Sequence, residues 1–312
     1  MKRQLLSLVF SAVCLLLITS SQAKAENIVV FGLSSGNMAL FQTDSTMPSV
    51  ITTPVLITGL LPGEFIIDIN FRPANGLLYA NTLQGNIYTL NQATGAATLV
   101  STTNPQISTN ASDFNPVVDR LRVGAPSQVS GNARINVDTG ETILDTPFAF
   151  ASGDPNFGRF PVIAGLSYTN SFAGASSTTL YGAISPSTGF PNTVFVVIPD
   201  PNAGTLITVG SLSSSLFDID ISGITGVAYG VAGSNQLFTI NLGTGALTQI
   251  GTITGGPSGV SGIQVLNIAA PVGTTQQEPV PEPTTILLLG TGLAGVGAAM
   301  RRRRKVNKTE QV

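Results

Sequence analysis

The sequence predicts an all-β protein, a β-propeller of about five four-stranded blades. Three observations predict this fold: short apolar alternations broken by turn residues, a repeat at a fixed offset of 150 residues, and an incomplete unit at each end of the repeat region. Val, Ile, Thr, Phe and Tyr dominate the apolar runs, and a helical period is missing from nearly all of them. Many short strands separated by turn signals are typical of such architectures.

The strongest repeat relates residues 67–96 to residues 217–246. Ile67-Asp68-Ile69 corresponds to Phe217-Asp218-Ile219, and Gly76-Leu77-Leu78-Tyr79 corresponds to Gly226-Val227-Ala228-Tyr229. Weaker copies lie between them, so each unit holds about four strands in roughly 40 to 50 residues, the pattern of a propeller blade. The long fourth unit leaves six blades as an alternative. A two-sheet sandwich is a second alternative, although it would not explain the fixed offset.

A turn motif and the two chain ends complete the fold prediction. The sequence Asn-x-x-Thr-Gly recurs at 91–95, 136–140 and 241–245. It predicts a tight turn between the third and fourth strands of a blade, with glycine at positive φ. Residues 28–33 resemble a second blade strand and residues 260–268 a lone first strand. Pairing of these two segments is expected to close the ring and remove its open edges.

Both termini carry features of export. Residues 1–25 combine Lys2 and Arg3, an apolar stretch and the sequence Ala23-Lys24-Ala25, which predicts a signal peptide cleaved after Ala25. Residues 284–300 are uncharged and apolar, and as a helix they would span about 25 Å, the short end of a membrane crossing. The basic residues that follow should stop transfer and keep 301–312 in the cytoplasm. They are Arg301, Arg302, Arg303, Arg304 and Lys305.

The predicted organisation is therefore a signal peptide at 1–25, an ectodomain at 26–270, a Pro-rich linker at 271–283, a transmembrane helix at 284–300 and a tail at 301–312. The linker ends in Pro281, Glu282 and Pro283. This motif, the apolar segment and the basic cluster together resemble the PEP-CTERM sorting signal of bacterial surface proteins. The resemblance implies export through the inner membrane, a membrane-held precursor, processing by an exosortase-type enzyme, and a place at the cell surface or outside the cell. It also implies a setting of exopolysaccharide production.

The ectodomain carries two further motifs. Phe71-Arg72-Pro73 precedes Leu78-Tyr79, and the run 113–122 reads Asp-Phe-Asn-Pro-Val-Val-Asp-Arg-Leu-Arg. These motifs resemble a family of secreted bacterial domains of unknown function, whose members combine an FRP…LY unit with a DFNPxxDRxR unit. The resemblance spans most of residues 28–268 and implies no activity.

Composition excludes several function classes. Residues 26–270 contain no Cys, His, Lys or Trp, and their five Arg and thirteen acidic residues give a net charge of −8. Disulfides are therefore excluded, as are Ser-His-Asp and Cys-His catalysis. The usual zinc ligands are missing and nucleic acid is not an expected partner. We predict no cofactor, metal or catalytic residue.

The polar run 113–122 is the candidate binding site, with Asp113, Asn115, Asp119, Arg120 and Arg122. These residues could form an internal clamp that braces one hairpin, or an anion- or sugar-binding face near the central channel. Asp68, Asp113 and Asp218 recur at equivalent repeat positions. They could accept backbone N–H groups within their own blades, bind calcium, or line a catalytic funnel.

Three hypotheses of function follow. The first is a non-catalytic binding or scaffolding propeller at the cell surface, associated with exopolysaccharide. The second is an extracellular glycoside hydrolase or lyase that uses the carboxylates of Asp68, Asp113 and Asp218. The third is a calcium-dependent lectin-like module.

Overall fold

Twenty-two strands in five separate sheets make up the part of the chain that the structure describes. The structure is a computed structural model that describes residues 24–107, 109–125, 131–185, 193–255 and 262–274. The expected sorting helix at 284–300 and all but the last two residues of the expected signal peptide lie outside these ranges. Within them, no helix is both long enough and apolar enough to cross a bilayer.

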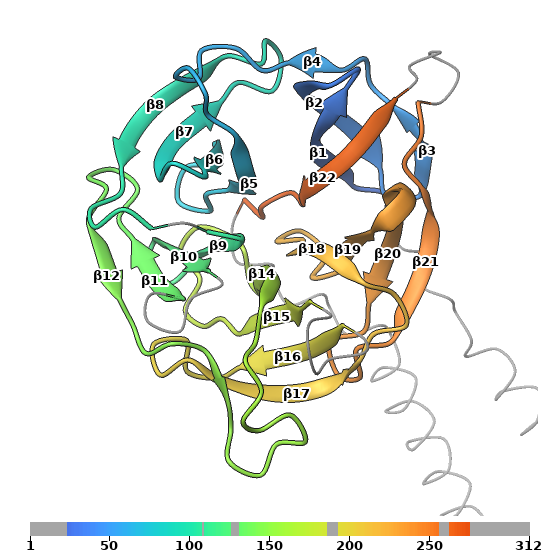
Figure 1. Cartoon of the computed structure of the whole chain (residues 1–312). Helices are drawn as coiled ribbons and strands as arrows, with labels where there is room; N and C mark the ends of the chain where they lie inside the picture. The colour runs from blue at the N-terminus through green and yellow to red at the C-terminus, as the bar shows by residue number, and fades with distance from the viewer. Residues whose placement is uncertain (1–23, 108, 126–130, 186–192, 256–261, 275–312) are drawn as a thin grey trace, which may run out of the picture. The chain divides into compact units, whose positions relative to one another are not determined.

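The five sheets are arranged as blades around a central axis (Figure 1). The first blade holds β22 (Ile263–Ala269), β1 (Asn27–Ser34), β2 (Asn37–Asp44), β3 (Met47–Ile51) and the short β4 (Val55–Leu56). The second holds β5 (Ile66–Phe71), β6 (Leu78–Thr82), β7 (Asn86–Leu90) and β8 (Ala97–Thr102). The third holds β9 (Ala111–Asn115), β10 (Arg120–Gly124), β11 (Asn132–Ile135) and β12 (Thr142–Leu144).

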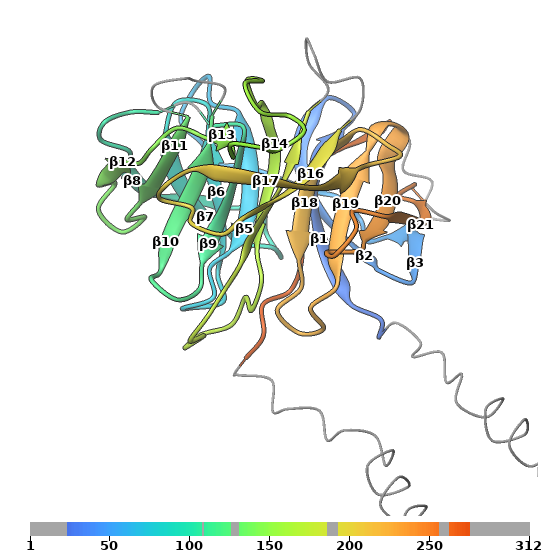
Figure 2. The same ribbon diagram turned by 90° about the horizontal axis from the view of Figure 1, so that it is seen from below.

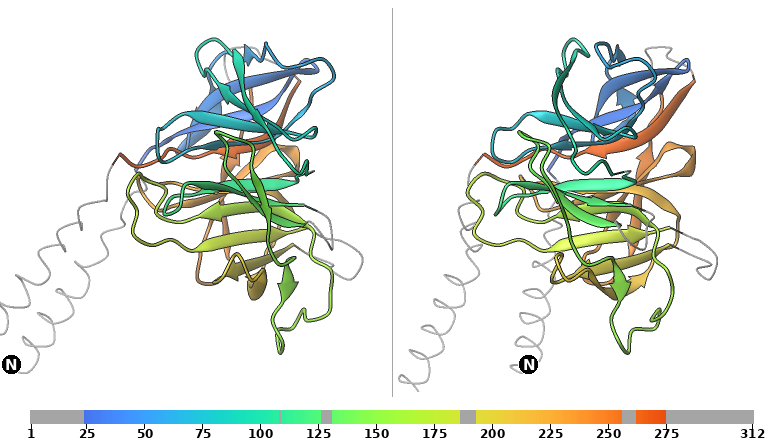
Figure 3. Two further views of the ribbon diagram at one scale, coloured as in Figure 1. Left: turned by 90° about the vertical axis from the view of Figure 1, so that its left-hand side faces the viewer. Right: turned by 60° about the vertical axis from the view of Figure 1, so that its left-hand side comes forward.

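The remaining strands form two blades. The fourth blade holds β14 (Ile163–Tyr168), β15 (Leu180–Ile184), β16 (Val194–Ile198), β17 (Thr205–Ser211) and a short outer strand, β13 (Ala149–Phe150). The fifth holds β18 (Leu216–Ile221), β19 (Ala228–Ala232), β20 (Gln236–Ile240) and β21 (Leu247–Thr252). The innermost strands of the five blades are β22, β5, β9, β14 and β18. From this strand each sheet twists toward the rim, as the side views show (Figure 3).

The repeat offset is reproduced strand by strand. Each strand of the second blade begins and ends 150 residues before its counterpart in the fifth, from β5 and β18 to β8 and β21. The prediction of a propeller is therefore confirmed. The described residues give five blades, so the six-blade and sandwich alternatives are wrong. The extra length of the fourth unit includes β13 and the segment that follows it, which projects from the rim (Figure 1).

The ring closes by pairing the two ends of the propeller. Strand β22 is the innermost strand of the first blade and runs antiparallel to β1, with Val29 opposite Ala269 and Ser34 opposite Ile263. This arrangement confirms the predicted closure. The start of β1 and the end of β22 lie on the same side of the ring (Figure 2). Glu26 reinforces the closure, because its carboxylate accepts hydrogen bonds from Ser222, Thr225 and Tyr229 of the fifth blade.

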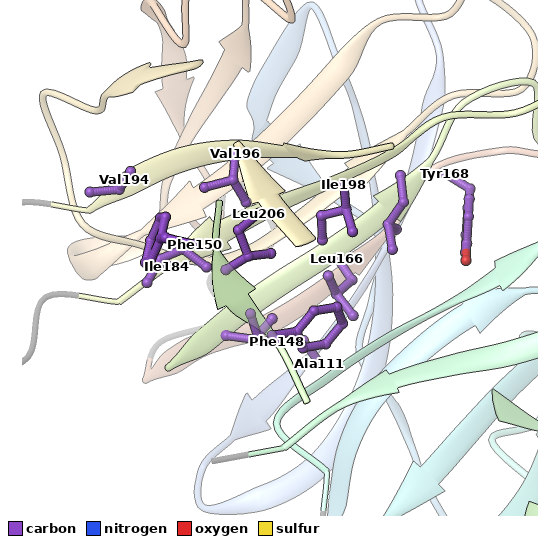
Figure 4. Close-up of a cluster of buried hydrophobic side chains, with 12 residues drawn as sticks. Ala111, Phe148, Phe150, Leu166, Tyr168, Ile184, Val194, Val196, Ile198 and Leu206 are labelled. Atoms are coloured by element: carbon purple, nitrogen blue, oxygen red, sulfur yellow. The ribbon is translucent and has the colours of Figure 1, made fainter. Parts of the chain in front are cut away.

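Among the described residues, the hydrophobic core is divided into five clusters that lie between neighbouring blades. The cluster between the third and fourth blades contains Ala111, Phe148, Leu166 and Tyr168, all buried (Figure 4). Since each sheet buries apolar side chains against the next blade, no blade can complete its core alone. The closed ring is therefore the unit that folds.

The Asn-x-x-Thr-Gly turns adopt the predicted form. Gly95, Gly140 and Gly245 have φ of 71°, 78° and 72°. In the first turn, Asn91 Oδ1 accepts the N–H groups of residues 93 and 94. These turns also join blades, because the N–H of Thr58 donates to the Gly95 carbonyl over 3.0 Å. Thr58 lies in the connection from the first blade to the second. The turn therefore closes the β7–β8 hairpin and also hydrogen-bonds to this connection.

Candidate functional site

Arg72 connects the two sequence motifs across a blade boundary. Its guanidinium donates Nε and Nη2 to Asp119 over 2.8 and 2.6 Å, and Nη1 and Nη2 to Asp138 over 2.7 and 2.8 Å. Its carbon Cζ also lies 5.7 Å from the ring centre of Tyr79. Hydrogen bonds to the two carboxylates raise the pKa of Arg72, so it remains charged. The FRP…LY motif of the second blade is thereby fastened to the DFNPxxDRxR motif of the third.

The run 113–122 forms the hairpin between β9 and β10. Asn115 Oδ1 accepts the N–H groups of Val117 and Val118, which fixes the turn. Asp119 follows with φ of 50°, a conformation that Asp tolerates better than most residues. The prediction that this motif braces one hairpin agrees with this geometry.

Arg122 lies on β10 with its side chain buried between the third and fourth blades. Its Nη1 donates to Asp145 over 2.6 Å and to Asn132 over 2.8 Å, and its Nη2 donates to Asn202 over 2.5 Å. Asp145 also pairs with Nε of Arg134 at 3.2 Å. One carboxylate therefore serves two guanidinium groups.

The predicted internal clamp does not form. Asp119 binds Arg72 of the second blade, while Arg122 contacts Asp145 of its own blade and Asn202 of the fourth. Arg120 makes no ion pair within the described ranges, and its Nη1 donates only to the Asp119 carbonyl. Asp119 lies in the turn before β10 at positive φ, whereas Arg120 and Arg122 share one face of the strand, so Asp119 and Arg122 are directed toward different neighbours. The run therefore joins three blades.

The three repeated aspartates lie on the innermost strands and are buried between blades. Each uses Oδ1 to accept the N–H of its own next residue. Oδ2 accepts an N–H from the next blade: Asp68 from Ser112 at 2.6 Å, Asp113 from Tyr168 at 2.6 Å, and Asp218 from Ile268 at 2.8 Å. We expected each aspartate to accept backbone N–H groups of its own blade. This is correct for Oδ1 and wrong for Oδ2, which accepts an N–H group of the next blade.

Asp220 adds a fourth buried carboxylate on β18. Its Oδ2 accepts the N–H of Ala270 over 2.6 Å, and its Oδ1 accepts the hydroxyl of Ser167 over 2.9 Å. Burial raises the pKa of Asp68 to about 7 and that of Asp220 to about 6, against hydrogen bonds that lower both. Burial and then repulsion from a neighbouring carboxylate raise the pKa of Asp113 and Asp218 as well.

Two cavities lie near these residues. The first, of about 150 Å³, lies between the third and fourth blades, and its lining includes Arg120, Arg122, Arg134 and Tyr168. The second, of about 310 Å³, lies where the inner strands begin and is lined by apolar residues of the axis such as Ile67, Phe217 and Leu266. Asp68, Asp113 and Asp218 line neither cavity. Within the described ranges, no three acidic side chains are placed to hold a metal ion.

Sequence reasoning missed part of this site. Arg134, Tyr168 and Asn202 lie 12 to 80 residues from Arg122 in the sequence, and none belongs to the motif at 113–122. The sequence signal that could have pointed to Arg134 is the rarity of arginine, because residues 26–270 contain only five. Three of these five line this cavity.

These features define a class of protein: a five-bladed β-propeller whose blades are joined by buried aspartates and arginine–aspartate pairs. The family model for a domain of unknown function, DUF4394, matches residues 39–264, and the chain belongs to this family. A second model, the PEP-CTERM protein-sorting motif, matches residues 279–304. No protein with a curated description matches the chain.

The two matches confirm both resemblances drawn from the sequence. The sorting motif indicates an exosortase substrate that is exported and processed at the cell envelope. The ectodomain belongs to a family without an assigned function, so its function must be argued from its own site.

Proposed function

We propose that this protein is presented at the cell surface or in the extracellular matrix, where its propeller acts as a non-catalytic binding and scaffolding module associated with exopolysaccharide. One observation carries the proposal. The carboxylates that would perform acid–base chemistry are engaged between blades, whereas the residues lining the cavity between the third and fourth blades include three arginines and Tyr168, all hydrogen-bond donors.

The proposed organisation follows the sequence. Residues 1–25 direct export, and cleavage leaves Glu26 as the first residue. Residues 271–283 carry Pro281, Glu282 and Pro283 as the motif that an exosortase-type enzyme recognises. Residues 284–300 hold the precursor in the membrane, with 301–312 on the cytoplasmic side.

A glycoside hydrolase is less well supported. Such an enzyme needs two carboxyl groups facing the scissile bond, about 5 to 10 Å apart. Asp68, Asp113 and Asp218 are at most 3% exposed, and both oxygens of each accept backbone N–H groups. Of the residues lining the cavity between the third and fourth blades, Asp200 alone is acidic, and its Oδ1 caps a turn.

A binding screen tests this proposal. The exported protein, recovered from the cell envelope in mild detergent, is assayed against extracellular polysaccharides with and without added calcium. We expect retention on at least one acidic polysaccharide, no dependence on calcium and no release of reducing ends. Release of reducing ends would assign an enzyme, calcium-dependent retention would assign a lectin-like module, and no retention on any polysaccharide would contradict the proposed partner.

A further inference from the structure

The cavity between the third and fourth blades concentrates positive charge in an acidic domain. Arg120, Arg122 and Arg134 line it, and together they are three of the five arginines in residues 26–270. Asp145 neutralises one of them and Asp200 lies in the lining, so the guanidinium groups exceed the carboxylates by one. Arg120 makes no ion pair within the described ranges, although its charge helps to lower the pKa of Asp138.

A buried hydroxyl in the same lining makes no hydrogen bond. Tyr168 is 1% exposed, and its hydroxyl has no partner of normal geometry among the described residues. Figure 4 shows Tyr168 at the edge of the apolar cluster. The Nε group of Arg122, also buried, lacks a hydrogen-bond partner as well. Burial raises the pKa of Tyr168, while the charge of Arg122 and polar contacts from the Arg122 and Asn115 side chains oppose this effect, so the hydroxyl keeps its proton and can donate to a ligand. Buried donors without a partner destabilise a fold unless a ligand pairs with them.

The shape of the cavity sets the size and polarity of its ligand. A volume of about 150 Å³ leaves room for one anionic group and part of a ring. The donors of Arg122 and Tyr168 are buried. Val118 and Pro201 supply apolar surface, and the exposed Asp200 supplies a carboxylate that could accept sugar hydroxyls. The lining thus combines donors for an oxyanion with groups that suit a hydroxylated ring.

We propose that this cavity binds the carboxylate of an acidic sugar, a uronate unit of an extracellular polysaccharide. The inference rests on the proposed function, to which it adds the chemical class of the ligand and the residues that bind it. The carboxylate accepts hydrogen bonds from the Tyr168 hydroxyl and from the guanidinium groups of Arg120 and Arg122. Arg122 is already held by Asp145, Asn132 and Asn202, so it is oriented before the ligand arrives.

The test is a titration of the full chain in mild detergent with sodium glucuronate, followed by calorimetry and by tyrosine ultraviolet difference spectra. The chain has no Trp and five Tyr, so the spectra report on tyrosines directly. Arg120→Gln should weaken binding about tenfold and Tyr168→Phe about fivefold, as expected for the loss of charged and neutral hydrogen bonds. The control Tyr181→Phe alters a tyrosine on the next strand, β15, that stacks on Phe195 and is absent from the cavity lining. It should leave binding unchanged.

Three results would overturn the proposal: equal binding of glucose and glucuronate, tighter binding of sulfate than of glucuronate, or unchanged affinity in both cavity variants. Binding of phosphatidylglycerol vesicles that requires Arg120, without binding of glucuronate, would assign a lipid headgroup and also overturn it. Failure of the proposed function is separately visible. If glucuronate binds but no polysaccharide retains the protein, the cavity assignment stands and exopolysaccharide is rejected as the partner. If a polysaccharide retains the protein but glucuronate does not bind, the polysaccharide binds elsewhere on the propeller and the cavity assignment is rejected.

Discussion

Buried aspartates at the axis make the stability of this propeller depend on pH. Asp68 has a folded-state pKa of about 7 and Asp220 one of about 6, while an unfolded aspartate titrates near 3.9. As pH rises above about 4, the unfolded chain loses these protons and the folded chain retains them. The free energy of unfolding therefore falls across this window and is lowest above pH 7.

We predict that the full chain in detergent melts at a higher temperature at pH 5 than at pH 8, measured by circular dichroism. Asp68→Asn removes one carboxyl group that stays protonated in the folded state, so it should reduce this difference in melting temperature. The Asp68→Asn variant leaves one of the two backbone N–H groups without an acceptor, so its pH dependence is compared and not its absolute stability. A variant with the same pH dependence as the original chain would contradict the assignment.

Glycine at the rim provides a second test at the scale of single residues. Gly95 and Gly76 share the same backbone conformation, with φ of 71° and 70°. A Cβ on Gly95 would lie 2.0 Å from the carbonyl oxygen of Leu56 in the first blade, whereas a Cβ on Gly76 would meet nothing within 4 Å. The two positions therefore separate backbone strain from the close approach of two blades.

We predict that Gly76→Ala costs about 1 to 2 kcal/mol from positive φ alone. Gly95→Ala should cost at least about 2 kcal/mol more, because the blades must separate to admit the methyl group. Urea unfolding of both variants measures the difference. Equal losses would show that the turn does not clasp the neighbouring blade.

At the scale of strands and turns, Arg72 joins two blades that the hydrophobic cluster between them also holds together. Its two carboxylate partners are partly exposed, with side chains 36% and 57% accessible, so they can be hydrated if the guanidinium is lost. Replacement should therefore loosen the contact between the second and third blades without leaving a buried unpaired charge.

We predict that Arg72→Met lowers the free energy of unfolding by about 1 to 3 kcal/mol and that Arg72→Lys recovers little of it. An ammonium group cannot make two bidentate contacts in a plane. Arg120→Met, on the neighbouring hairpin, should cost under about 0.5 kcal/mol because Arg120 has no ion pair among the described residues. If Arg72→Lys were as stable as the original chain, charge alone and not geometry would account for the contact.

The blades themselves could be predicted from sequence, while the contacts between them could not. A repeat offset of 150 residues was enough to align all four strands of two blades, and incomplete end units were enough to predict the pairing of β1 with β22. The partners of Arg72 and Arg122 in neighbouring blades are 47 to 80 residues away, and no local period relates them. Closure of the ring brings them together, so only the structure could assign them.

The candidate site could likewise be predicted from the sequence only in part. Arg120 and Arg122 stand out in the sequence because charge is rare in this domain. Tyr168 resembles any other buried strand residue, and its unpaired hydroxyl becomes visible only once the fourth blade packs against the third.

At the scale of the whole molecule, the fold suits an exported domain that has no disulfides. Closure by β22 removes the open sheet edges around the axis, and Glu26 anchors the beginning of the domain to the fifth blade. The sorting motif at 279–304 follows the last described strand by only a few residues. The propeller is thus complete before the chain reaches the segment that directs its processing.

Intact-mass and terminal-peptide mass spectrometry of the protein from the cell envelope tests the central claim most directly. We predict a mature chain that begins at Glu26 and lacks Arg301, Arg302, Arg303, Arg304 and Lys305, because export removes the leader and processing removes the basic end. Envelope material that retains an intact carboxyl terminus, or full-length chain found dissolved in the cytoplasm, would contradict the account of an exported and processed propeller.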